Sequence, residues 1–138
     1  MIETILLAYD GSEPAQKAYD HAADLAVRYG AALYILAVAR PPEFGSEVET
    51  EAVIEQSRRH YHHVLKPLKE RVAAAGLTAR FEVAVGHPAE QIILHAEREK
   101  VGLIVMGHRG TGFLARWLVG SSVKHVVAHA PCTVVVVR

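Results

Sequence analysis

The 138-residue sequence has a single cysteine, Cys132, which excludes an internal disulfide and a metal site built on clustered cysteines. It has no apolar run approaching the roughly 18 residues of a membrane span, and its first residues lack the basic start and cleavage region of a signal peptide. Its formal net charge is zero, which argues against nonspecific binding to nucleic acid. We therefore expect a cytoplasmic protein that binds neither membranes nor nucleic acid.

Acidic residues are absent after Glu99. Residues 1–99 contain ten lysines and arginines against fifteen aspartates and glutamates, a formal charge of −5. Residues 100–138 contain five basic residues and no acidic one, a charge of +5. A segment without acid tolerates an anionic ligand, so this distribution favours an anion site in the C-terminal part of the chain. The alternative is that it only reflects which helices carry surface charge.

The length of 138 residues predicts one domain over residues 1–138 with a single core, and the 51% share of apolar residues excludes a disordered chain. Short apolar runs alternate with segments of helical periodicity, a pattern typical of an α/β fold with a parallel sheet and helices on both faces. A loop is expected over 43–50, and Pro67 predicts a kink or a break in the following helix. Ligands of such sheets bind beyond the carboxyl ends of the strands. The expected strands are 2–9, 31–39, 78–85, 102–106 and 133–137, and the expected helices are 13–29, 51–75, 86–100 and 121–130.

A glycine-rich segment, residues 107–112, directly follows an expected strand, and Gly120-Ser121-Ser122 follows after seven more residues. Gly107 and Gly110 permit positive φ and allow backbone amides to approach a ligand. Ser121 or Ser122 can cap the last helix, and Arg109 can bind a phosphate. We expect the amides between residues 107 and 122 to lack protein acceptors and to form an anion site. The alternative is two tight turns around a helix.

The spacing of these glycines decides between phosphate motifs. No Lys-Ser or Lys-Thr pair follows them, so the Walker motif is absent. A loose dinucleotide fingerprint at 110–115 lacks the acidic ribose ligand that should follow about 20 residues later. The remaining pattern is G-x2-G-x9-G-S, formed by Gly107, Gly110, Gly120 and Ser121, and with it the sequence resembles the ATP-binding members of the universal stress protein family. The resemblance extends to Tyr9-Asp10-Gly11-Ser12, to Gly86-His87-Pro88-Ala89, to the strand end at 103–107 and to the tail at 131–137.

The resemblance implies a single-domain, five-stranded parallel sheet in the order 3-2-1-4-5, a Rossmann-like fold of the adenine nucleotide alpha hydrolase type. It implies binding of ATP, or of ADP or AMP, with Mg²⁺ or Mn²⁺. Two departures bear on the phosphate contacts: Ser122-Val123 reverses the usual order of an aliphatic and a hydroxyl residue, and Lys124 stands where the family often has an acid. The resemblance implies that Asp10 lies beside the ribose and metal, that Ala8 and Tyr9 line the cleft, and that the backbone of Val38 recognises adenine. It also implies two groups of residues around the rest of the ligand: Met106, Gly107, Arg109 and Gly110 around the ribose and phosphates, and Gly120, Ser121 and Ser122 at the phosphates.

The favoured function is that of a nucleotide-binding sensor or regulator in stress adaptation. The resemblance also implies a homodimer, paired through the edge strand Thr133–Val137. Asp10 is the one acid or base that converges on the expected site, so dedicated catalysis is not expected. Two alternatives remain open: a slow ATPase or phosphotransferase, and a dimerisation module of the same fold that binds no nucleotide.

Several residues also have a purely structural interpretation. Asp10 can be a turn residue that caps the first helix. The pairs His60 and His63, and His125 and His129, are expected on solvated helix faces, because no further ligand stands at metal-binding spacing. Cys132 is expected to be a buried thiol.

Overall fold

The computed structural model describes residues 2–108 and 120–138. In these residues strands and helices alternate along the chain, as the sequence predicts. The first three strands are one to three residues shorter than expected, the fourth is displaced by one residue toward the C-terminus, and the fifth has the expected bounds. The elements are β1 (Thr4–Ala8), α1 (Glu13–Tyr29), β2 (Ala32–Ala39), α2 (Glu47–Ala74), β3 (Ala79–Val85), α3 (Pro88–Arg98), β4 (Leu103–Gly107), α4 (Gly120–His129) and β5 (Thr133–Val137).

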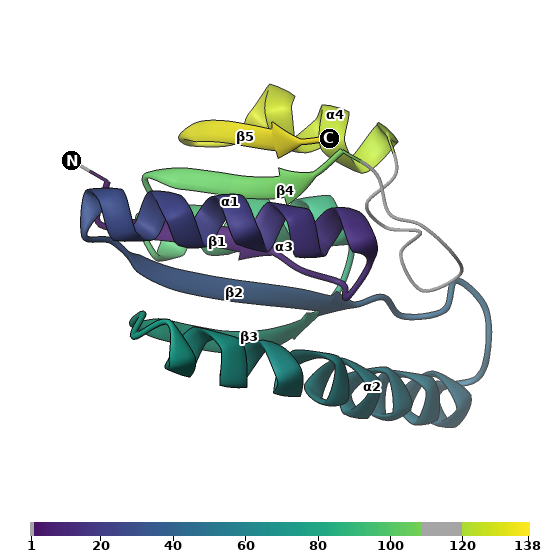
Figure 1. Cartoon of the computed structure of the whole chain (residues 1–138). Coiled ribbons are helices and arrows are strands. Elements are labelled where there is room, and N and C mark those ends of the chain that lie inside the picture. The colour runs from purple at the N-terminus through teal and green to yellow at the C-terminus, as the bar shows by residue number, and fades with distance from the viewer. Residues whose placement is uncertain (1, 109–119) are drawn as a thin grey trace.

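The strands form one parallel sheet in the order β3-β2-β1-β4-β5, which confirms the predicted fold class and strand order. Helices α1 and α2 cover one face, and α3 and α4 cover the other (Figure 1). The central strand β1 pairs with β2 on one side and β4 on the other. Because the chain winds outward in opposite directions from β1, the carboxyl ends of β1 and β4 flank the point where the winding reverses.

The core lies between the sheet and its two helical layers. The three inner strands are buried on both faces, and Ile5, Leu6 and Leu7 of β1 are fully inaccessible to solvent. Such strands are continuous apolar runs because no face of theirs meets water. The edge strand β3 alternates instead, with Arg80 and Glu82 exposed and Phe81 partly buried.

Local signals fix the helix ends. The Ser12 side chain accepts a hydrogen bond from Ala15 N at 3.2 Å and starts α1, which ends at Gly30 in the left-handed conformation (φ 65°). Helix α2 starts at Glu47, inside the expected loop, because Ser46 and Glu49 form a reciprocal capping box. The predicted loop was therefore too long.

Helix α2 continues through Pro67 without interruption, so of the kink or break expected there, the break does not occur. Proline removes one backbone donor from a helix. Leu65 and Leu68 on either side are both buried, and Val72 one turn later is buried as well, so packing on the sheet holds the helix together across the defect.

A polar network links β2, β3 and α3, in which Tyr34 and His95 are buried and Glu82 and Arg80 are exposed. The Tyr34 hydroxyl donates to the Glu82 carboxylate and lies 2.9 Å from Nδ1 of His95. Since the hydroxyl proton is used on Glu82, Nδ1 of His95 carries a proton and donates to Tyr34. The Arg80 guanidinium covers the Tyr34 ring at 4.6 Å and pairs with Glu99. The network satisfies a histidine that is otherwise removed from water.

Across 2–108 and 120–138, every helix is too short or too polar to traverse a lipid bilayer.

Candidate functional site

The carboxyl ends of β1, β2 and β4 bring together most of the described residues that the sequence assigns to a site. Ala8 ends β1, Val38 lies next to the end of β2, and Met106 and Gly107 end β4; all four are buried. They share one edge because the three strands are parallel and adjacent. Tyr9 follows β1 and donates its amide to Leu36 O at 2.9 Å, which extends the ladder by one bond.

The backbone of Val38 faces the space beyond the carboxyl end of β1. Ala39 O accepts from Gly86 N, on the β3 side, whereas Leu36 O accepts from Tyr9 N, on the β1 side. Because main-chain groups alternate in direction along a strand, the N–H and C=O of Val38 point to the β1 side. The β1–β2 register ends at Ala8 and Leu36, two residues earlier. Val38 therefore presents a main-chain donor and acceptor just past the end of β1, and neither group pairs with β1 in the described part of the chain.

Asp10 lies in this space and has one unsatisfied oxygen. Its side chain is only 2% exposed, and Oδ1 accepts a hydrogen bond from Ser12 N at 3.0 Å, the geometry of a turn residue. Oδ2 is buried and has no partner in the described residues. Burial raises the pKa of this carboxyl, and the hydrogen bonds with Ser12 oppose the rise. The structural and the functional interpretation of Asp10 are therefore compatible, with one oxygen for each.

Gly107 serves a different purpose from the one expected. It is not among the glycines with positive φ, so it does not use the conformational freedom that the sequence permits at this position. A Cβ there would lie 2.9 Å from Cβ of Pro14 and 3.0 Å from its carbonyl carbon and oxygen. Glycine is needed because the first turn of α1 abuts the end of β4. Positive φ occurs instead at Gly11 (φ 83°), in the turn between β1 and α1.

The start of α4 differs from the expected cap. Gly120, Ser121 and Ser122 form the first turn of α4, so neither serine stands at the capping position before the helix. Ser122 is buried, and Lys124 is exposed. The amide of His108 donates to Val137 O at 2.7 Å and is thus not a free donor, contrary to the prediction for this part of the segment. Arg109 and Gly110 lie outside the described residues.

His60, a residue near this edge, is predicted from the sequence to lie on a solvated helix face. His60 of α2 is half-buried, and its Nε2 is buried without a partner in the described residues. The prediction that His60 lies on a solvated helix face is therefore wrong. Helical spacing alone does not show which face of α2 meets the β1–α1 turn.

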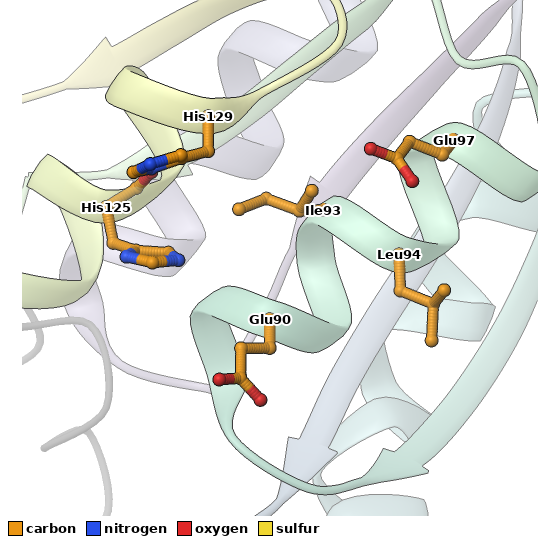
Figure 2. Close-up of a pocket in the computed structure, with 6 residues that line it drawn as sticks. All are labelled: Glu90, Ile93, Leu94, Glu97, His125 and His129. Carbon is orange, nitrogen blue, oxygen red and sulfur yellow. The ribbon is translucent and has the colours of Figure 1, made fainter.

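A second candidate site is a shallow groove of about 360 Å³ between α3 and α4 (Figure 2). The rings of His125 and His129 stack there with centroids 4.5 Å apart, and both residues are exposed, as the sequence predicts. Within the described chain, no group of three or more histidines, cysteines and acids is arranged to hold a metal ion, here or elsewhere. The groove includes none of the carboxyl-edge residues; it is lined by Glu90, Ile93, Leu94, Glu97, His125 and His129.

The strand order, with the winding reversed beside β1, defines a doubly wound α/β protein. The buried carboxylate of Asp10 and the main-chain groups of Val38 place its candidate site at this switch point of the sheet. The chain belongs to the universal stress protein family, which it matches over residues 1–138. It is 39% identical over 140 residues to a universal stress protein of Thermus aquaticus, with 100% of both chains covered. It is 33% identical over 153 residues to universal stress protein YxiE of Bacillus subtilis, again with 100% of both covered.

Solved structures give the same answer for the fold. UspA from Lactobacillus plantarum superposes with a TM-score of 0.84 at 29% identity, covering 99% of this chain and 97% of that chain. A universal stress protein in complex with cAMP has a TM-score of 0.74 at 24% identity, with 99% and 97% covered. One from Archaeoglobus fulgidus in complex with dAMP has a TM-score of 0.65 at 17% identity, with 100% and 98% covered. At the last two identities the likeness shows the fold alone.

Proposed function

We propose that this universal stress protein binds an adenine nucleotide, ATP or its di- or monophosphate, at the carboxyl edge of β2, β1 and β4, and acts as a nucleotide-dependent regulator. The observation that carries the proposal is the buried Oδ2 of Asp10, which has no partner in the described residues. A buried acceptor left unsatisfied costs about 1–3 kcal/mol, so the site favours a ligand that donates to it. Ribose hydroxyls are such donors.

The fold orients the proposed ligand. On the β2 side, Val38 offers a backbone donor and acceptor that do not pair with β1 in the described residues, which suits the edge of an adenine ring. On the β4 side, α4 begins at Gly120, and the first amides of a helix attract phosphate. The nucleoside would thus lie toward β2 and the phosphates toward α4, with Ala8, Tyr9, Met106 and Gly107 beneath them. The predicted contacts of Arg109 and Gly110 belong to the same proposal.

A divalent cation fits this arrangement in one way. Within the described chain no cluster of three protein ligands exists, and Asp10 supplies one free carboxylate oxygen. Mg²⁺ keeps several waters and is held by one or two carboxylates together with substrate phosphates. Asp10 would hold Mg²⁺ or Mn²⁺ in this manner, and the cation would neutralise phosphate charge.

Relatives of the same fold support the ligand class. Structures of other universal stress proteins are described in complex with cAMP and dAMP and with AMP bound. Those ligands share with ATP an adenine attached to a pentose, which is ribose in AMP and cAMP and 2′-deoxyribose in dAMP, and they differ from ATP in their phosphates. We therefore propose the adenine nucleoside as the common element and leave the phosphate count to the binding experiment.

The proposal extends to the assembly. Residues 1–138 would form one domain, located in the cytoplasm, that dimerises through β5. This strand is an edge of the described sheet, and Val134, Val135 and Val136 are only partly buried. An apolar edge strand without cover invites pairing, and antiparallel pairing of two copies is self-complementary.

Isothermal titration with ATP, ADP and AMP in the presence of Mg²⁺ tests the binding proposal. We expect saturable binding at one site per chain and a loss of at least tenfold in affinity in Asp10→Asn, because the variant cannot offer a charged acceptor. Asp24→Asn is the matched control, since Asp24 is exposed on α1 and forms an ion pair with the exposed Arg28. Absence of saturable binding up to millimolar nucleotide would refute the proposal.

A further inference from the structure

Two buried side-chain atoms without a hydrogen-bond partner occur in the described part of the chain, Oδ2 of Asp10 and Nε2 of His60. The first belongs to the proposed nucleotide site. The second is on α2, in a residue that neither the sequence motif nor the fold assigns to any role. Buried polar atoms are nearly always paired, so each unpaired one calls for an explanation.

The packing of α2 places His60 beside the turn that carries Asp10. Val64 of α2 is so close to Gly11 that a Cβ at Gly11 would lie 2.7 Å from Cγ1 of Val64. His60 is four residues before Val64 and therefore on the same face of the helix, about 6 Å further along its axis. The N-terminal half of α2 extends past the carboxyl ends of β2 and β3 (Figure 1). His60 thus flanks the carboxyl edge next to the β1–α1 turn.

The sheet order determines which part of a nucleotide could reach this histidine. Helix α2 packs on β2 and β3, whereas α4 packs on β5, at the other end of the sheet. The proposed phosphate position lies toward α4 and the proposed nucleoside position toward Val38 of β2. A hydrogen bond from α2 would therefore be made with the base or the ribose.

We infer that His60 is a nucleoside-recognition residue whose Nε2 hydrogen-bonds the base or ribose of the bound nucleotide, on the side opposite the phosphates. The inference rests on the proposed nucleotide site and adds a contact to it from α2. A neutral imidazole nitrogen can donate or accept, so it suits a ring nitrogen or the amino group of adenine as well as a ribose hydroxyl. Bound nucleotide would then satisfy both orphaned atoms at once.

The test compares ATP and AMP on the wild type and on His60→Ala by isothermal titration. Loss of one uncharged hydrogen bond weakens binding about three- to tenfold. Because the contact is with the nucleoside, the loss should be the same for both ligands. His60→Gln, which can place an amide nitrogen near the position of Nε2, should recover part of the affinity. His63→Ala, an exposed histidine on the same helix, should bind as the wild type does.

Three results would overturn the inference. Unchanged affinity in His60→Ala would show that the imidazole makes no contact. A loss larger for ATP than for AMP would place the contact on the phosphates. If His60→Ala fails to fold, the imidazole ¹⁵N shifts of wild-type His60 replace it, and no change on addition of AMP would contradict the contact. If the wild type binds neither nucleotide, the proposed function itself is refuted. The titration of the wild type alone distinguishes this outcome from a failure of the inference about His60.

Discussion

At the scale of single residues, Asp10 combines a structural and a functional demand. One oxygen fixes the turn before α1 by accepting from Ser12 N, and the other is buried without a partner. Burial holds the pKa of this carboxyl above its ordinary value of 3.8. The folded state therefore binds the proton more tightly than the unfolded state, and stability falls as pH rises from 3.8 through the folded pKa. At neutral pH the ionised group is a cost to the fold.

The variant Asp10→Asn should raise the free energy of unfolding without nucleotide at pH 7 by about 1 kcal/mol, because it removes a buried charge and keeps an Oδ1 acceptor for Ser12 N. Urea denaturation at pH 7 measures the change. Below pH 3.8 the wild type is neutral at this position, so the gain should disappear there. A variant less stable than the wild type at pH 7 would mean that the carboxylate is needed for the fold.

At the scale of elements, the network of Tyr34, Glu82 and His95 fastens α3 to β2 and β3. Burial lowers the pKa of His95 below its ordinary value of 6.5, although the nearby Glu82 opposes the shift. Between 6.5 and the lower folded pKa, the unfolded state binds a proton that the folded state does not. Stability is therefore lost as pH falls through that interval.

We predict that His95 makes the free energy of unfolding decline as pH falls below 6.5, and that His95→Gln removes this contribution to the pH dependence. Urea denaturation at a series of pH values measures the slope. His63→Gln is the matched control and should keep the wild-type slope, because His63 is exposed. An equal slope in wild type and His95→Gln would show that His95 does not titrate differently in the two states.

At the scale of the whole molecule, the proposed dimer depends on which main-chain groups of β5 face outward. Val137 O accepts from His108 N, so the backbone of Val137 faces β4. By alternation Val135 also faces β4, whereas the N–H and C=O of Val134 and Val136 point away from the sheet. Proline is tolerated at an edge position whose N–H faces outward.

Val136→Pro should therefore remove a donor needed for pairing between two copies while leaving the β4–β5 ladder intact. We expect sedimentation velocity to show a monomer for this variant and a dimer for the wild type. Val136→Thr keeps the amide and the branched side chain, so it should remain dimeric. A dimer that survives in Val136→Pro with unchanged sedimentation would locate the interface elsewhere.

The sheet was predictable because each inner strand is a short apolar run followed by a turn or by proline. The start of α2 was predictable in principle, since Ser46 and Glu49 have the spacing of a capping box. No local signal in the sequence shows that α2 continues through Pro67. The continuity of the helix depends on the burial of Leu65 and Leu68 against the sheet. The site was predicted only in part, because the burial of His60 depends on how α2 crosses the β1–α1 turn, which periodicity does not specify.

The tight contact between Gly107 and Pro14 has a consequence for mutational screens. Any larger residue at 107 would push the first turn of α1 away from β4, whether or not a ligand is present. A saturation library scored for folded protein would therefore reject nearly every substitution at this codon. If such a screen tolerates no substitution at 107, the result would reflect the close packing of α1 against β4. It would carry no information about what the protein binds.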